Sequence, residues 1–136
     1  MGNSHNKDEE DTLPLEFNHI DLIVAIRNND LKKIKRLLFE KDDISFQDLN
    51  PNRFSSLHLA CYNEEISNEV LSFLFEKKID VNLLDNYHQT AFHFYCQNKS
   101  ITMEGINMFI ENKVDLFAKD YFGISGKKKK KILYFI

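Results

Sequence analysis

The chain has 136 residues, of which 43% are hydrophobic and 29% are charged, the composition of a globular domain. The formal net charge is −3, and without the five lysines at 127–131 the remaining 13 basic and 21 acidic residues leave a balance of −8. This acidic body argues against general binding to a nucleic-acid backbone, and two cysteines are too few for a disulfide framework. No segment has the ~20 apolar residues of a membrane span, and no apolar signal core follows the N-terminus, so we expect a cytoplasmic protein.

Residues 1–16 are predicted to form a disordered acidic tail. The run Asp8–Asp11 is entirely acidic, and the segment has little apolar surface to bury. Gly2 stands where N-myristoylation would occur, but Asn6 replaces the Ser or Thr that the motif requires. The sequence leaves open whether Gly2 is lipidated.

From residue 17 onwards the sequence repeats itself. The segment SSLHLACYN at 55–63 aligns with TAFHFYCQN at 90–98, an offset of 35 residues. A weaker copy lies upstream, where Leu22 and Ala25 precede the Leu and Ala of the 55–63 segment by the same offset. A fixed period of this length is typical of an array of stacked units.

Each unit is predicted to contain two antiparallel helices joined by a short turn. The second helix carries apolar residues at helical spacing, as at Ile34, Leu37 and Leu38 in the first unit. One such pair cannot bury its apolar face alone, whereas stacked pairs can. The predicted helices are 20–28 and 30–40, 56–63 and 67–77, and 91–98 and 102–112.

The segments S-S-L-H-L-A at 55–60 and T-A-F-H-F-Y at 90–95 resemble the T-P-L-H-x-A signature of the ankyrin repeat, whose period is ~33 residues. The resemblance implies an all-α solenoid of stacked antiparallel helix pairs joined by β-turn or hairpin loops. It spans about 17–125, divided into units at about 17–47, 48–84 and 85–119 and a partial fourth unit at 120–125.

The resemblance assigns structural roles to the signature residues. Ser55 and Thr90 precede helices, where a hydroxyl can accept a hydrogen bond from a free backbone N–H, and His58 and His93 are expected to link neighbouring loops. The hairpin position that favours positive φ keeps a glycine at Gly123. The full set of signature residues is Ser55, Leu57, His58, Ala60, Thr90, Phe92, His93 and Gly123.

Three departures from the family pattern are notable. Ser56 and Ala91 replace the proline that usually starts the first helix, so those helix starts are less preset. Arg53 and His88 occupy the hairpin glycine position. Tyr95 stands where an alanine is expected, and we expect its ring to open that helix contact or to take another route.

A fourth unit opens at 120–125 and is followed by Gly126, five lysines and ILYFI instead of a helix signature. We interpret 126–136 as an aberrant, frameshifted tail or the end of a gene model, with a genuine basic tail as the alternative. For a genuine tail, Lys127–Lys131 could serve as a nuclear-localisation signal, with an anionic-lipid patch and an exposed, disordered spacer as the alternatives. Without a fourth unit, Ile106, Phe109 and Ile110 are expected to be exposed, which favours weak self-association through the uncapped third repeat.

Metal binding and catalysis are not expected. His58 and Cys61 lie three residues apart on one helix face, as do His93 and Cys96, a spacing that could hold metal ligands. The repeat register explains each of these residues without a metal, and no paired base and nucleophile stands out. We therefore predict a chain that is not an enzyme and that has no cofactor.

The resemblance implies a non-catalytic protein-protein interaction module, a scaffold or adaptor that binds a protein partner through its hairpin tips and concave helix face. An alternative is a targeting or regulatory arm of a larger signalling or ubiquitin-pathway protein. Tyr62, Asn63, Asn98 and Lys99 are expected to border the binding face. The candidate partner-binding residues are Arg53, Phe54, Asn86, Tyr87, His88, Gln89, Tyr121 and Phe122.

Overall fold

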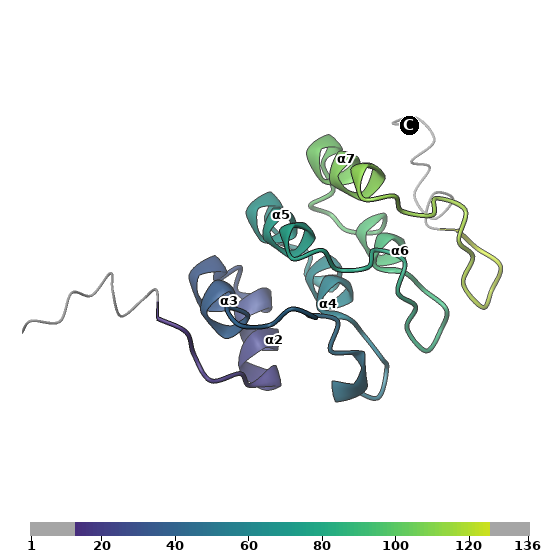
Figure 1. Cartoon of the computed structure of the whole chain (residues 1–136). Coiled ribbons are helices and arrows are strands. Elements are labelled where there is room, and N and C mark those ends of the chain that lie inside the picture. Colours follow the sequence, from purple (N-terminus) through teal and green to yellow (C-terminus); the bar gives the residue numbers. More distant parts are fainter. Residues whose placement is uncertain (1–12, 126–136) are drawn as a thin grey trace, which may run out of the picture.

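The computed structural model of the chain describes residues 13–125. Within this range, six α-helices form three antiparallel pairs that stack in two layers (Figure 1). The predictions for Gly2, for most of the N-terminal tail and for residues 126–136 lie outside the described residues. The pairs are α2 (His19–Arg27) with α3 (Leu31–Leu37), α4 (Ser56–Tyr62) with α5 (Asn68–Glu76), and α6 (Ala91–Tyr95) with α7 (Met103–Glu111).

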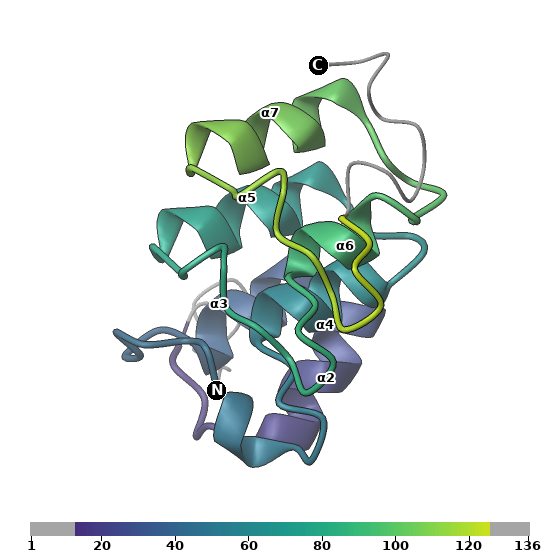
Figure 2. The same ribbon diagram turned by 90° about the vertical axis from the view of Figure 1, so that its right-hand side faces the viewer.

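The inner layer consists of α2, α4 and α6, and the outer layer consists of α3, α5 and α7 (Figure 1). Hairpin loops project from the inner layer and lie side by side along one edge of the stack (Figure 1 and Figure 2). Within the described residues the only β pairing is an isolated antiparallel bridge between Lys119 and Ser125. The all-α repeat architecture predicted from the sequence is thus confirmed.

Five of the six α-helices in residues 13–125 follow a residue whose side chain accepts a hydrogen bond from a free backbone N–H, and at α6 the Thr90 N–H donates to the His93 ring. In α2 the Asn18 side chain accepts hydrogen bonds from the N–H groups of Ile20 and Asp21, at 2.9 and 3.2 Å. Capping of this kind stabilises a helix by about 1 kcal/mol, which matters for helices of only five to nine residues. The residues whose side chains cap a helix in this way are Asn18, Asp30, Ser55, Ser67 and Thr102.

The helix pattern differs from the prediction in three places. The helix α3 ends at Leu37, whereas the prediction extended it to residue 40. The helix α6 ends at Tyr95, because the N–H groups of Gln97 and Asn98 bond three residues back, to Phe94 and Tyr95, and the chain tightens into a turn. The first hairpin loop contains a 3-10 helix, η1 (Gln47–Leu49), that the apolar pattern did not predict.

The Tyr95 ring is fully buried between the layers, and the helix contact does not open around it. Its hydroxyl accepts a hydrogen bond from the Thr102 N–H at 3.1 Å. Space for the ring comes from Gly105 in α7, where any Cβ atom would overlap the Tyr95 hydroxyl. The large residue in the inner helix is therefore matched by the smallest residue in the outer helix.

The expected exposure of the third repeat is wrong for two of three residues. Ile106 and Phe109 are buried, because they lie on the side of α7 that faces the rest of the stack. The Phe109 ring lies 5.1 to 5.2 Å from the rings of Phe75, Phe92 and Tyr95. Only Ile110 keeps a substantial exposed fraction, 39%.

Candidate protein-binding surface

The signature histidines join each hairpin loop to the next. The Ser55 N–H donates to His58 Nδ1 at 3.1 Å, so the proton of the neutral ring lies on Nε2. His58 Nε2 then donates to the Gln89 carbonyl at 2.8 Å, 31 residues further along the chain. His93 repeats this arrangement and reaches the Ile124 carbonyl at 3.1 Å.

Backbone hydrogen bonds also connect the loop tips directly. The Asn86 N–H donates to the Asn52 carbonyl at 3.0 Å, and the Tyr121 N–H donates to the Tyr87 carbonyl at 3.2 Å. Within the second loop, Asp85 Oδ1 accepts from two N–H groups at 2.8 Å. These bonds hold the three loops as one continuous edge.

The loops share a left-handed residue at the position where the family pattern has glycine. Its φ is 55° at Arg53, 57° at His88 and 75° at Gly123. Only a few per cent of residues other than glycine adopt such a φ. The same turn therefore occurs in all three loops. At Arg53 and His88 its backbone conformation is unfavourable, and the hydrogen bonds of the loops offset this cost.

Large side chains project from this edge. The exposed fractions are 52% for Tyr87, 62% for Tyr121 and 78% for Phe122. The imidazole of His88 stacks on the Tyr121 ring with 4.0 Å between centroids. Arg53 is exposed and forms an ion pair with Asp48.

Two of the candidate residues do not project. Gln89 is half-buried, and its carbonyl is the acceptor for His58. The Phe54 ring is also half-buried and turns towards the inner helices, 5.6 Å from the Phe94 ring and edge-on to it.

Phe94 was not among the residues predicted from the sequence, yet its ring contacts several other rings on the inner face. Its half-buried ring lies 5.5 Å from the His58 ring and 6.0 Å from the Tyr62 ring, both edge-on. Tyr62 is 72% exposed. Phe94 directly follows the signature histidine, as Leu59 does in the preceding unit, and this register was the signal that could have identified it.

A shallow hollow of about 230 Å³ lies between α4 and α6 beside these rings. Tyr62 and Phe94 give it an apolar wall, and Glu64 and Gln97 supply polar groups at its margin. The shape and lining suit one apolar side chain with a hydrogen-bonding group next to it.

Asn98 does not border the binding face as expected. Its side chain is buried, and its Nδ2 donates to the carbonyls of Cys61 and Asn63 at 2.9 and 2.7 Å. The half-buried Asn63 does the same one repeat earlier, where Nδ2 donates to the Ile26 carbonyl at 3.0 Å. These amides join the loops between helices and so belong to the framework. Lys99 is exposed at this edge.

The two cysteines, Cys61 and Cys96, are both buried. Burial, together with the neighbouring Cys96 thiol, raises the pKa of Cys61 well above its ordinary value, so it is held as a thiol. No group of three or more metal-ligating side chains occurs in residues 13–125. In the same range, no helix has the length and apolar character needed to cross a bilayer.

Comparison with known proteins identifies the repeat. The family model for ankyrin repeats, in three copies, matches residues 22–120, well over half of the chain. No curated protein matches the sequence. Ankyrin repeats are generally protein-binding and typically non-catalytic modules. With its period, its histidine-linked hairpins and its stacked helix pairs, the chain belongs to the ankyrin repeat family.

Proposed function

We propose that this chain is a scaffold or adaptor module that binds a partner protein across its hairpin tips and inner helices. The observation that carries the proposal is the set of exposed aromatic side chains at Tyr87, Tyr121 and Phe122 on loops whose backbones are bonded to one another. Aromatic residues are enriched in binding hot spots. Because the loops are already ordered, binding loses little conformational entropy.

The hollow beside Phe94 is proposed as a second anchor point on the same surface. An apolar partner side chain inserted there would contact the Tyr62 and Phe94 rings, while Gln97 would bond a polar group of the partner's backbone. Such a segment would run from the inner helices towards the tips.

A finer role, as the targeting or regulatory arm of a larger signalling or ubiquitin-pathway protein, would use the same surface. It remains a prediction from the family resemblance. The cytoplasmic compartment and the nuclear alternative through Lys127–Lys131 also remain predictions, from the lack of apolar segments and from the lysine run. All of these roles would use the exposed aromatic residues of the hairpin tips, Tyr87, Tyr121 and Phe122, so the experiment changes residues of this set.

The test compares Phe122→Ala and Tyr87→Ala with Phe39→Ala in affinity purification from cells. Phe39 is a matched control, because it is an exposed aromatic residue that follows α3 in the outer layer. The tip variants should lose specific interactors and keep the wild-type Tm. The proposal fails if both tip variants retain every interactor, or if Phe39→Ala loses the same ones.

A further inference from the structure

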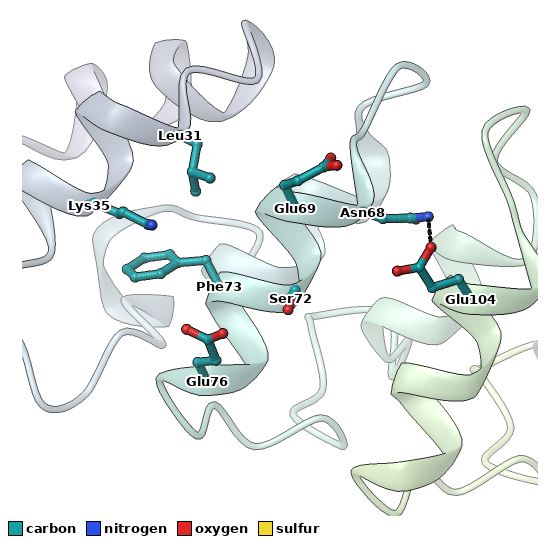
Figure 3. A pocket seen from close by; sticks show the side chains of 8 residues that line it. All are labelled: Leu31, Lys35, Asn68, Glu69, Ser72, Phe73, Glu76 and Glu104. Atoms are coloured by element: carbon teal, nitrogen blue, oxygen red, sulfur yellow. Dashed lines mark hydrogen bonds between the residues drawn. The ribbon is translucent and has the colours of Figure 1, made fainter.

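A groove runs along the outer layer, on the side of the molecule opposite the hairpin tips. It lies between α3 and α5 and has a volume of about 260 Å³. Leu31 and Lys35 line it from α3, and Glu69, Phe73 and Glu76 line it from α5 (Figure 3). Glu104 of α7 borders the same depression. The lining is therefore mixed: Leu31 and Phe73 are its half-buried apolar members, and the other side chains are charged or polar.

The charges on the two sides of the groove are of opposite sign. The sequence of α3, LKKIKRL, contains four basic residues and no acidic residue. The sequence of α5, NEVLSFLFE, contains two glutamates and no basic residue. The next outer helix, α7, also has two glutamates and no basic residue. The outer layer thus changes from basic to acidic across the groove.

In residues 13–125, no ion pair joins Lys35 to Glu69 or Glu76 across the groove. Lys35 Nζ lies over the Phe73 ring, 5.7 Å from its centroid (Figure 3). Among residues 13–125, neither Glu69 nor Glu76 forms an ion pair with a lysine or arginine. Glu104 accepts a hydrogen bond from the Asn68 side chain at 2.9 Å. The carboxylates remain available to an external basic group.

A partner that complements this surface must place acidic groups opposite α3 and basic groups opposite α5. A second copy of the chain does this by symmetry when the two-fold axis runs along the groove at its surface. The α5 helix of the second copy then faces α3 of the first, and its α3 faces α5. We propose that two copies associate through the α3–α5 groove in this way.

The two apolar residues of the groove fit the same arrangement. Four helices would surround the axis, with Leu31 and Phe73 near it, Lys35 over the Phe73 ring, and Glu69 and Glu76 at the flanks. Apolar residues at the centre and opposite charges at the flanks are the pattern of helical association interfaces.

The helices are short, which limits the strength of the dimer. At 1.5 Å per residue, α3 and α5 are about 10 and 14 Å long. Their combined footprint is smaller than the ~800 Å² per partner of a stable interface. The association is therefore weak, and because its charges are solvent-exposed it weakens further in salt. It does not depend on the proposed function, since the tips stay free.

The test is sedimentation equilibrium of the full chain at rising concentration in 50 and 500 mM NaCl. The average mass should rise from 16.1 kDa towards twice that value at low salt, and less at high salt. Two charge-reversed variants, Lys35→Glu and Glu69→Lys, should each stay monomeric. Mixed in equal amounts they should associate again, because each supplies the charges that the other has lost.

Matched controls separate the groove from net charge. Glu65→Lys and Arg27→Glu change net charge by the same amounts at exposed positions outside the groove, and they should dimerise like the wild type. A wild type that is monomeric at every concentration overturns the proposal. So does a dimer that both groove variants retain, which would indicate association through another surface such as the end of α7.

Discussion

The hydroxyl of Tyr95 occupies the space that a side chain at Gly105 would need. A Cβ atom on Gly105 would overlap this hydroxyl and lie 2.6 Å from Tyr95 Cζ. The two residues come from different helices of one repeat, and they replace the usual small residue in the inner helix by a small residue in the outer helix. The tyrosine at position 95, where the family pattern has alanine, is thus accommodated by the glycine ten residues later.

Gly105→Ala is expected to destabilise the protein by about 1–3 kcal/mol, the usual cost of overpacking a core. In a Tyr95→Ala background the same change should be neutral or stabilising, because the ring is gone and alanine favours the helix by up to ~1 kcal/mol. Urea unfolding of the four proteins gives the coupling energy. Equal effects of Gly105→Ala in both backgrounds would contradict the pairing.

Stability should fall as the pH drops below about 6.5. Burial of the His58 ring is the main cause that lowers its pKa below the ordinary value of 6.5, and the Gln89 carbonyl and the Asp85 charge oppose this only in part. The unfolded chain therefore binds a proton that the folded protein resists. The contribution of His58 is complete above pH 6.5 and is lost as the pH falls through the folded pKa.

This pH dependence can be measured by urea unfolding between pH 8 and pH 5. His58→Gln removes the titrating ring and should flatten the slope below pH 6.5, although it also lowers stability at every pH. An NMR titration of the wild type gives the pKa directly. A folded-state value at or above 6.5 for His58 would refute the prediction.

Asn98→Ala is expected to cost about 2 kcal/mol, because it leaves the buried carbonyl of Cys61 without its donor and removes the acceptor of the Ser100 N–H. Asn107→Ala is the matched control, since Asn107 is exposed on α7 and its loss should change stability by less than about 0.5 kcal/mol. Thermal unfolding of both variants checks the difference. Similar Tm values for the two would show that Asn98 is not a framework residue.

The thiols of Cys61 and Cys96 should react slowly in the folded protein. Both are buried, and the raised pKa of Cys61 keeps it protonated at neutral pH. With a chromogenic disulfide reagent at pH 8, labelling should follow the rate of unfolding and become immediate in 6 M guanidinium chloride. Rapid labelling of the native protein would indicate an opening between α4 and α6.

Much of the fold could be predicted from local pattern. Helix pairs, their order and the stacking of units follow from apolar spacing and a repeat of 35 residues, which are properties of short segments. The helix ends were less accurate, as at α6, because Asn98 is held by carbonyls of the preceding repeat and the chain turns early.

The candidate surface could be predicted only in part. Exposure of Tyr87 and Phe122 follows from their place at loop tips, whereas Phe54, on the same loop edge, turns inward because the Phe94 ring of the next repeat lies beside it. The charge change across the outer groove is present in the sequences of α3 and α5. It becomes a surface feature only when these helices lie side by side.

The sequence by itself determined the repeat period, the helix pairs and the family, because helix propensity and register act over a few neighbouring residues. Tertiary structure alone decided that Tyr95 is buried against Gly105, that Asn98 is a framework residue, and that Ile110 is exposed while Phe109 is not. Burial depends on which side chains approach from adjacent helices and repeats, often about 35 positions away, and no local pattern contains that information.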